Sequence, residues 1–394
     1  MTYFLGIDNS SLDHKVCILN NEGNLYSQFT IENNLTGFNA LGTELKNFDE
    51  VLIGFELPHG PLIDYLKTKN YTTYSLNPLK IKRFKETITV SGNKNDKIDA
   101  AAIAEYLRRN HNQCRPMIYS SSEVEKLKML CIIHNRMTEE HSRYINKLHF
   151  AVRQYFYLHE SLFSHFGCTV QLKMLIKYPT FDDLRQASDE ELILFLKSNH
   201  YHNPKYITKL LGKIRKHEQL ISPDVVYAYL HEVNMLCEIM SSIERSLKDI
   251  EKEMIGILDN HHLGKIFRSI PGVGTILGSN LLALFGDNMS RFDNANQAQC
   301  LFGTAPKNYQ SGSYHKVTMR KACNKYARTV LYRFAFETLI HSKWARAYYD
   351  MQKTKGKKHS VAIRSLSNKW VKIIFRLWKD EVFYEEDKKL VAAA

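Results

Sequence analysis

The chain has 394 residues, of which 44% are hydrophobic and 24% charged, an ordinary balance for a globular protein with room for about two or three cores. No stretch approaches the roughly 18 uninterrupted apolar residues of a membrane span, and the N-terminus MTYFLGIDNS does not have the pattern of a secretion signal. The seven cysteines are scattered without a CxxC pair, which argues against a zinc ribbon and a secreted disulfide framework. We therefore expect a cytoplasmic protein with no membrane partner.

The positive charge is concentrated toward the C-terminus. Between Pro306 and Lys379 there are eighteen Lys or Arg residues against two acids, a local net charge of +16, whereas the whole chain carries +13. A surface that needs only to be soluble intersperses both signs. The segregation therefore favours a polyanionic partner, such as nucleic acid, for the C-terminal part.

The N-terminal region combines strand and helix signals. Runs of β-branched and aromatic residues separated by polar turns predict a meander of three strands, followed by helix, strand, helix and strand. The expected strands are Tyr3–Ile7, Lys15–Leu19, Leu25–Ile31, Val51–Phe55 and Thr72–Ser75, with helices at Leu35–Lys46 and Pro61–Lys69. This order is that of a ribonuclease H-like fold, in which the first strand is central and the fourth lies beside it.

Two acids follow strands of this expected sheet. Asp8 comes directly after the first strand, and Glu56 directly after the fourth. Because these strands are neighbours in a ribonuclease H-like sheet, we expect their ends to bring the two carboxylates together. Acids at strand ends in this order have no structural need to exist, which favours a functional role.

Two further acids, Asp96 and Asp99, open the next expected helix, which runs to about Arg109 and which Asn93 or Asn95 can cap. Their spacing of three places both on one helix face, near a terminus whose dipole favours anions. Phosphoryl transfer uses two divalent ions about 4 Å apart, which need several carboxylate oxygens. The four acids together predict such a site, although first-turn acids can also serve only to stabilise a helix.

Long helices are expected from Ser121 onward. Ser122 with Glu125, and Ser188 with Glu191, have the spacing of a capping box at a helix start. The helices that begin there belong to a middle region whose apolar residues recur at spacings of three and four, the pattern of a coiled coil.

Two coiled-coil seams are predicted. The first runs from Leu127 to Tyr155 and is weakened by His134 and His141. The second follows a strict heptad pattern through Val233, Leu236, Met240, Ile243, Leu247, Ile250, Met254 and Ile257. Its partner is either the earlier helix of the same chain or a second subunit, because both would bury the same stripe.

Beyond the coiled coil, the turn Pro271-Gly272-Val273-Gly274 opens an apolar helix expected at Thr275–Phe285. The pattern is that of a helix-hairpin-helix turn. Glycines there let backbone N–H groups at a helix N-terminus approach a DNA phosphate without reading the base sequence, which makes Gly272 and Gly274 candidate DNA contacts. The same turn can also be needed only for packing.

Ser311 and Ser313 flank Gly312 in a polar stretch that we expect to be a loop between two apolar helices. The candidate phosphate-binding residues around it are Lys307, Lys316, Arg320, Lys321, Lys325 and Arg328. A serine among these cations can attack a bound phosphate if a metal or base assists its deprotonation. By itself, however, Ser-Gly is only a turn.

These motifs in this order resemble the DEDD transposases, relatives of the Piv invertase with a RuvC-like N-terminal domain. The resemblance includes the four acids, IPGVG, GTAPKNYQSG and the basic helix RKACNKYARTVLY, and it extends from about Thr2 to about Lys379. It implies that Asp8, Glu56, Asp96 and Asp99 bind Mg²⁺, with two ions in each active site. It also implies that a serine becomes covalently joined to DNA. That serine is Ser311, with Ser313 as the alternative.

The resemblance has further implications for partners. It implies a homodimer or homotetramer in which the acids of one subunit act with the serine of another. It also implies a structured noncoding RNA, the bridge RNA, that pairs with donor and target double-stranded DNA and supplies sequence choice. Delegating readout to base pairing is consistent with a chain that has neither zinc fingers nor an evident helix-turn-helix motif.

We thus expect an α/β domain followed by all-α parts. A RuvC-like metal-binding domain is predicted at 1–115, a helical linker with the coiled coil at 116–262, and a transposase domain with the serine and a basic nucleic-acid-binding surface at 263–390. The expected function is an RNA-guided insertion-sequence transposase that recombines DNA through a phosphoserine intermediate. Such an enzyme would associate with the nucleoid of a bacterial cytoplasm.

Three alternatives compete with this hypothesis. A RuvC-type resolvase would hydrolyse Holliday junctions with metal-activated water. An actin-like kinase is suggested by FLGIDNSS, but Asn9-Ser10-Ser11 lacks the glycines that let a backbone approach a triphosphate. A non-catalytic coiled-coil DNA-binding protein would use only the basic region.

Overall fold

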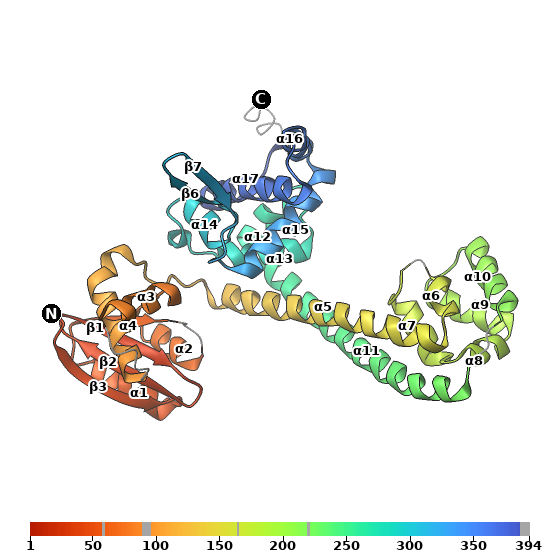
Figure 1. Cartoon of the computed structure of the whole chain (residues 1–394), viewed down its shortest axis with the longest axis horizontal. Coiled ribbons are helices and arrows are strands. Elements are labelled where there is room, and N and C mark those ends of the chain that lie inside the picture. The colour runs from red at the N-terminus through yellow and green to blue at the C-terminus, as the bar shows by residue number, and fades with distance from the viewer. Residues whose placement is uncertain (57–59, 89–95, 164, 219–220, 387–394) are drawn as a thin grey trace. The chain divides into compact units, whose positions relative to one another are not determined.

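The computed structural model describes residues 1–56, 60–88, 96–163, 165–218 and 221–386 (Figure 1). The chain divides into two compact units, Met1–Ile118 and Tyr119–Ala394. The first is a mixed α/β unit, and the second is helical in its described residues apart from one short hairpin. No helix in the described part of the chain has both the length and the apolarity that crossing a bilayer requires.

A five-stranded mixed sheet with the order β3-β2-β1-β4-β5 forms the centre of the first unit. Strands β1 to β3 make an antiparallel meander, and β4 and β5 run parallel to β1. The strands are Thr2–Asn9 (β1), Asp13–Leu19 (β2), Leu25–Glu32 (β3), Glu50–Phe55 (β4) and Thr72–Ser75 (β5). The five predicted strands are confirmed, and so is the pairing of the first with the fourth.

In the described residues of this unit, four α-helices accompany the sheet: Leu35–Leu45 (α1), Pro61–Thr68 (α2), Pro78–Ile88 (α3) and Asp96–Asn110 (α4), followed by a 3₁₀ turn at His111–Gln113. Helix α3 is absent from the sequence-based predictions. Its start follows a simple rule, because the side chain of Asn77 accepts a hydrogen bond from the N–H of Leu79 at 2.9 Å and Pro78 occupies the first turn. The expected caps Asn93 and Asn95 lie outside the described residues.

Helix α4 packs closely on the centre of the sheet. A Cβ at Gly6 of β1 would lie 2.1 Å from the carbonyl oxygen of Ala100 and 2.4 Å from the nitrogen of Ala104. On the neighbouring strand, a Cβ at Gly54 would lie 3.2 Å from the side chain of Ile103. The two glycines therefore let the α4 backbone approach β1 and β4 directly.

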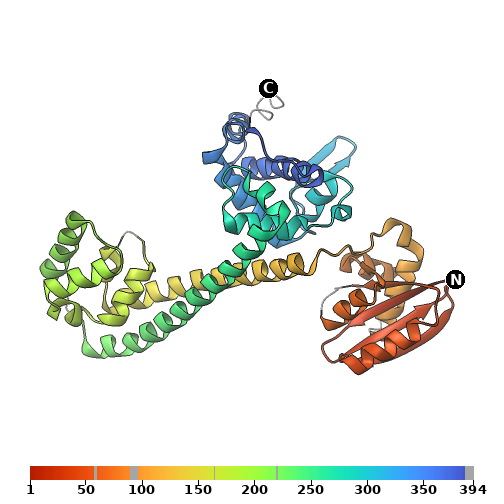
Figure 2. The same cartoon turned by 180° about the vertical axis from the view of Figure 1, so that it is seen from behind.

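Two long antiparallel helices, Ser122–Tyr155 (α5) and Pro223–Asn260 (α11), run side by side in the second unit (Figures 1 and 2). The start of α5 meets the end of α11, where Lys126 Nζ lies 2.8 Å from a carboxylate oxygen of Glu253. The predicted seam of α11 therefore has the earlier helix of the same chain as its partner, which the sequence pattern had left open.

The two histidines that weaken the α5 seam face carboxylates of α11. His134 Nε2 lies 2.9 Å from Glu251 Oε1, and His141 Nε2 lies 3.4 Å from Glu244 Oε1. Because a half-buried polar side chain needs its own partner, these two pairs favour one register of α5 against α11.

One predicted helix cap is confirmed and another is shifted. Ser188 and Glu191 form a reciprocal capping box at the start of the helix Asp189–Ser198 (α9). The cap of α5 is Ser121 rather than Ser122, and its hydroxyl accepts from the N–H of Val124 at 3.4 Å. The reason is conformational, since Ser121 has an extended ψ of 159° whereas Ser122 is already helical.

Between α5 and α11 the structure describes five helices: Leu158–Leu162 (α6), Thr169–Lys177 (α7), Phe181–Gln186 (α8), α9 and Pro204–Lys216 (α10). They share one hydrophobic core with the end of α5, including Leu148 and Val152, and with the start of α11, including Val233 and Leu236. This connecting set of helices is called the insertion below.

The rest of the second unit has its own core. Its elements are His262–Arg268 (α12), Thr275–Phe285 (α13), a 3₁₀ turn at Met289–Arg291, Ala295–Leu301 (α14), Lys307–Ser311 (β6), Tyr314–Thr318 (β7), Lys325–His341 (α15), Lys343–Thr354 (α16) and His359–Asp380 (α17). Phe285, Trp370 and Trp378 are fully buried in this core, which also includes Val124 of α5 and Leu258 of α11. The two hydrophobic cores thus lie at opposite ends of the antiparallel pair of helices α5 and α11.

Candidate functional site

Asp8 lies on the face of β1 that α4 covers. Successive side chains of a strand alternate between the two faces, so Phe4, Gly6 and Asp8 share one face. Phe4 packs in the same core as Ile103 of α4, and Gly6 abuts the α4 backbone. Asp8, at the end of β1, is therefore the next position in the row of β1 residues that faces α4.

Glu56 leaves the sheet at the same level. Strand β4 is parallel to β1, and Ile7 pairs with Phe55, so the next residues of the two strands are Asp8 and Glu56. Gly54 faces α4, and alternation directs position 56 to the same side. The expectation that the first and fourth strands end together is confirmed by this register.

The other two acids belong to the first turn of α4, and the helix packs with this turn toward the same end of the sheet. Positions 96, 99, 100 and 103 form one stripe by the helical spacing of three and four. Ala100 and Ile103 on that stripe are fully buried against the sheet. Position 99 directly precedes the Gly6 contact at Ala100 and position 96 lies about one turn before it, although of Asp96 only the backbone is described.

Lys85 of α3 forms an ion pair with Asp99. Its Nζ lies 2.6 Å from Asp99 Oδ1, and the two side chains are 23% and 17% exposed. Helix α3 is held against α4 by the buried Ile81 and by an edge-to-face contact of Phe84 with Tyr106, with ring centroids 5.4 Å apart. The sequence-based reasoning missed this lysine because it missed α3, although the Asn-Pro pair at its start was an available signal.

The chemistry of these donors fits a hard divalent cation. Within the described residues, no three His, Cys, Asp or Glu side chains come close enough to form a cation site. The acids that the sheet and α4 direct to this end are nevertheless all carboxylates, the ligands that Mg²⁺ prefers. The ammonium group of Lys85 against Asp99 also shows that a positive charge is accommodated there.

We expect replacement of Lys85 by methionine to lower the stability of the metal-free protein by about 1 to 2 kcal/mol. The reason is that a half-buried Asp99 would lose its counter-charge. The measurement is thermal unfolding in EDTA and in Mg²⁺, with the exposed Lys82→Met on the same helix as the matched control. Mg²⁺ should restore most of the loss in Lys85→Met. Equal melting temperatures of the two variants in EDTA would contradict the prediction.

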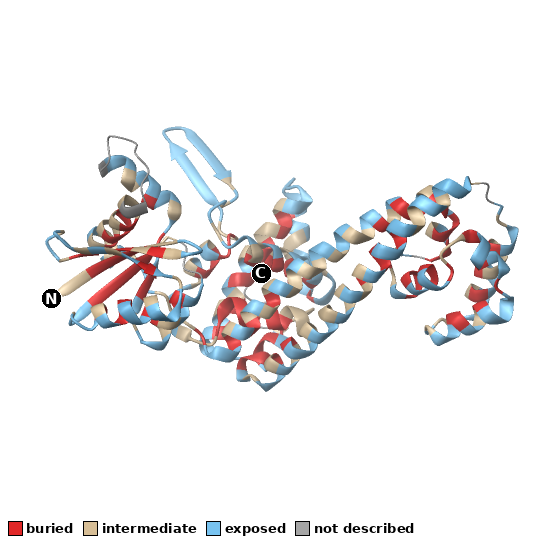
Figure 3. Ribbon diagram, turned by 90° about the horizontal axis from the view of Figure 1, so that it is seen from below, coloured by how far each residue is buried: buried red, intermediate tan, exposed pale blue. Residues whose placement is uncertain are grey.

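The stretch expected to be a loop is a β-hairpin, so that expectation was wrong. Strands β6 and β7 pair from Lys307 with Thr318 to Ser311 with Tyr314. Gly312 has a φ of +54°, and its place as first residue of a two-residue turn fits type II′. Both faces of the hairpin are exposed (Figure 3). Strands without a buried face have no hydrophobic alternation, which is why the pattern did not reveal them.

One face of the hairpin carries the candidate nucleophile and cations together. By alternation and cross-strand register, Ser311 shares that face with Lys307, Tyr309, Tyr314 and Lys316. Lys307 Nζ lies 4.5 Å from the ring centroid of Tyr309, and its hydrogen bond and charge lower the pKa of the Tyr309 hydroxyl. Ser313, by contrast, lies in the turn. Both serines are exposed and accessible to a polymeric substrate.

The remaining candidate cations differ in their surroundings. Lys321 and Lys325 are exposed, whereas Arg320 is half-buried. Arg328 donates from Nη1 to the carbonyl oxygen of Arg320 at 3.0 Å and to the sulfur of Cys323 at 3.5 Å. Arg328 therefore supports the turn before α15, and the contact of these side chains with phosphate stays a prediction.

The glycine turn lies between α12 and α13, as the sequence suggested. Gly272 has a φ of +76°, and a Cβ there would lie 2.9 Å from Cδ2 of His341, so both conformation and packing require glycine. Gly274 caps α13 without a side chain, and within the described residues its added Cβ would have no neighbour within 4 Å. The helix start is thus open, and its binding of phosphate stays a prediction.

Comparisons with known proteins match both the region of the four acids and the region of the glycine turn and the hairpin. Residues 5–157 match the DEDD transposases of the IS110 type, described as "Transposase", and residues 264–350 match a second model, described as "Transposase IS116/IS110/IS902 family". The chain belongs to the DEDD transposase family. A DEDD transposase cleaves and recombines DNA, which argues against the actin-like kinase. Neither model covers residues 158–263 of this transposase.

Relatives of this DEDD transposase align over most of its length. It is 26% identical to the mini-circle putative transposase for IS117 of Streptomyces coelicolor, with 98% of the chain and 96% of the relative covered. It is 24% identical to the IS900 uncharacterized 42 kDa protein of Mycobacterium paratuberculosis, with 76% and 75% covered. It is also 24% identical to the IS110 uncharacterized 43.6 kDa protein of Streptomyces coelicolor, with 74% and 72% covered.

Proposed function

We propose that this transposase moves an insertion sequence by cutting and joining donor and target double-stranded DNA through a phosphoserine intermediate. The observation that carries the proposal is the exposed hairpin, on which Ser311 shares a face with Lys307 and Lys316. Such a face suits a DNA strand, because the cations hold the backbone while the serine hydroxyl remains accessible.

The acids of the first unit would hold the metal. Asp8, Glu56, Asp96 and Asp99 form the ligand set of a RuvC-like centre for two Mg²⁺ ions, which when bound neutralise the scissile phosphate and steady the attacking and leaving oxygens. The parallel pairing of β1 with β4 and the close packing of α4 support this assignment. Lys85 would release Asp99 when the carboxylate takes up this role.

The hydroxyl of Ser311 would attack the scissile phosphorus. An Oγ–P bond forms and the P–O3′ bond breaks, which leaves a 5′-phosphoserine and, after the 3′ oxygen takes up a proton, a free 3′-hydroxyl. The proton of Ser311 passes to solvent or to a carboxylate. A 3′-hydroxyl of the other DNA then attacks the phosphoserine, so the phosphodiester is restored and the serine is released.

The proposed function also includes an oligomeric assembly of the transposase and a guide RNA. In a homodimer or homotetramer, the acids of one subunit would act with Ser311 of another. A bridge RNA paired with donor and target DNA would choose the sites. The glycine turn supports this division, because backbone N–H groups at a helix start bind phosphates without reading bases.

We expect Asp8→Asn and Glu56→Gln each to reduce Mg²⁺-dependent DNA cleavage by at least about 10³-fold, because each removes a charged ligand of the proposed centre. Titration of the DNA-free protein with Mn²⁺ by calorimetry should show the lost metal binding independently of activity. Glu22→Gln, in an exposed turn of the same unit, is the control and should retain both properties. Cleavage that survives in EDTA, or full metal binding by Asp8→Asn, would refute the assignment.

A further inference from the structure

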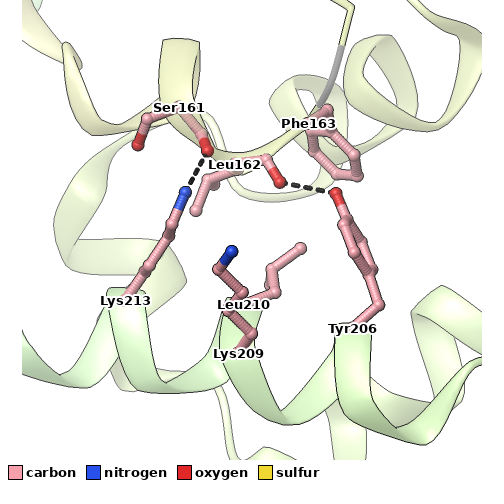
Figure 4. A pocket seen from close by; sticks show the side chains of 7 residues that line it. All are labelled: Ser161, Leu162, Phe163, Tyr206, Lys209, Leu210 and Lys213. Atoms are coloured by element: carbon pink, nitrogen blue, oxygen red, sulfur yellow. Dashed lines mark hydrogen bonds between the residues drawn. The ribbon is translucent and has the colours of Figure 1, made fainter.

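We infer that α10 carries a second phosphate-binding surface for a nucleic-acid backbone, centred on a pocket between α6 and α10 (Figure 4). This surface lies in the insertion, which neither family model covers. It includes none of the proposed metal ligands and no residue of the hairpin that carries Ser311. It therefore extends the proposed function rather than depending on either catalytic group.

Helix α10 is basic along its whole length. Its 13 residues PKYITKLLGKIRK contain five basic side chains and no acid. Lys205, Lys209 and Lys213 recur every four residues and so form one row, while Ile207 and Leu210 are buried in the core of the insertion. Like charges at this spacing cost a few tenths of a kcal/mol for each pair. The row therefore weakens the helix slightly. Within the described residues, only Lys213 makes a contact that would help to explain it, a hydrogen bond to the carbonyl oxygen of Ser161.

The acids nearby are already paired. Arg215 of α10 forms an ion pair with Asp189, in which Nη2 lies 2.8 Å from Oδ1. Glu160 of α6 is held by His149 at 2.9 Å and by Arg153 at 3.2 Å. In the part of the chain that the structure describes, the row of lysines on α10 forms no ion pair. Its positive charge is thus available to an external anion.

The pocket beside this row has a volume of about 170 Å³. Its lining consists of Ser161, Leu162 and Phe163 from α6 and its end, with Tyr206, Lys209, Leu210 and Lys213 from α10. Lys213 donates to the carbonyl oxygen of Ser161 at 2.6 Å, and the Tyr206 hydroxyl donates to that of Leu162 at 2.7 Å. Figure 4 shows Lys209 between these two hydrogen bonds, and within the described residues its amine has no partner.

These groups suit a phosphodiester. The ammonium groups of Lys209 and Lys213 can bind phosphate oxygens, because each carries three N–H donors. The row from Lys205 to Lys213 is about 12 Å long, at 1.5 Å per residue. Because each strand of a duplex presents one phosphate for about every 3.4 Å of axis, the row can follow three or four phosphates.

A membrane surface is the less favoured source of phosphate. A helix that binds a bilayer inserts its apolar face into the lipid boundary. The apolar face of α10, which includes Ile207, Leu210 and Ile214, is instead buried within the insertion. Only the charged side of α10 is left for an external partner, which favours a polyanion that binds through its backbone charge alone.

The surface is well separated from the hairpin region along α5. The insertion packs on α5 from Tyr144 onward, whereas the core of the hairpin region contacts α5 only up to Cys131. Tyr144 comes 13 residues after Cys131, which corresponds to about 20 Å of helix. The insertion would therefore hold a different segment of nucleic acid from the one that meets Ser311.

The test uses the full-length protein and compares the triple variant K205Q/K209Q/K213Q with wild type. Fluorescence anisotropy measures binding of a 40-base-pair DNA duplex and of a structured RNA of equal length between about 50 and 300 mM NaCl. For at least one of them we expect the affinity at low salt to fall at least 10-fold. The slope of log K against log salt should fall by about 2 to 3, because each lost phosphate contact contributes about 0.9. Loss with DNA alone or with RNA alone identifies the ligand.

The matched control K173Q/K177Q/K197Q removes the same charge from the same set of helices and should change the slope by less than 1. Equal changes in the two triple variants would overturn the inference, because they would indicate only net charge. Salt slopes that stay unchanged with both nucleic acids would also overturn the inference. The same holds if wild type binds phosphatidylserine vesicles and only K205Q/K209Q/K213Q loses that binding. Should the triple variant unfold, Lys209→Gln should still lower the slope by about 1 and Lys209→Arg should restore it.

Discussion

Replacement of Ser311 by alanine should abolish the covalent protein–DNA adduct and lower strand exchange by about 10⁴-fold or more, as loss of an enzymatic nucleophile does. The substitution removes only an exposed hydroxyl on an exposed strand, so the fold and the affinity for DNA should be unchanged. The measurement is a denaturing gel of the full-length protein with Mg²⁺, guide RNA and end-labelled DNA that carries donor and target sites.

Ser313→Ala is the matched control, because it removes a second exposed hydroxyl two residues away. The structure distinguishes the two positions: Ser311 is paired with Tyr314 and lies on the face of Lys307 and Lys316, whereas Ser313 lies in the turn. An adduct lost only in Ser313→Ala would move the nucleophile to the turn. Metal-dependent cleavage without an adduct in any sample would instead favour the hydrolytic resolvase. DNA binding without any metal-dependent cleavage would favour the non-catalytic protein.

Replacement of Gly6 by valine should unfold the first unit while leaving the second intact. An added Cβ would meet the backbone of α4 at 2.1 Å from the oxygen of Ala100, and backbone atoms at such a distance cannot move aside without displacing the helix. We expect a cost of about 3 kcal/mol or more. The displaced helix carries Asp96 and Asp99, so metal binding should be lost as well.

The two units can be followed separately. The three tryptophans of the chain, Trp344, Trp370 and Trp378, all belong to the second unit, so their fluorescence during urea unfolding reports that unit. Limited proteolysis followed by mass spectrometry reports the first. For Gly6→Val we expect an unchanged fluorescence transition and rapid cleavage within residues 1–118.

The control for Gly6→Val is Gly212→Ala. Gly212 is inside α10, and within the described residues a Cβ there would have no neighbour within 4 Å. Alanine should therefore stabilise that helix by about 0.5 to 1 kcal/mol. A first unit as protected from protease in Gly6→Val as in Gly212→Ala would show that α4 does not need the close approach.

Some features could be read from local sequence because local rules decide them. The five strands of the sheet followed from β-branched runs between polar turns, and the α9 cap followed from the spacing of Ser188 and Glu191. The order of the elements was enough to predict that β1 and β4 are neighbours. Asp8 and Glu56 were therefore recognisable as acids that leave the sheet together.

Other features were decided only by tertiary structure. The hairpin of Ser311 has no buried face and therefore no periodic signal, so only its pairing reveals it. The ion pair of Lys85 with Asp99 joins helices that are consecutive in the chain, yet no sequence rule predicts it because its geometry depends on how α3 packs against α4.

The sequence by itself thus determined the types of the main elements, the segregation of charge and the family. It did so because strand and helix signals, capping and composition are local properties of the chain. Only the tertiary structure decided that α11 pairs with α5 of the same chain, that Gly6 allows α4 to reach the sheet, and that the lysines of α10 border a pocket. The physical reason is that these contacts join segments that are distant along the chain or lie on different elements, and one stripe of apolar or charged residues is compatible with several partners until packing selects one.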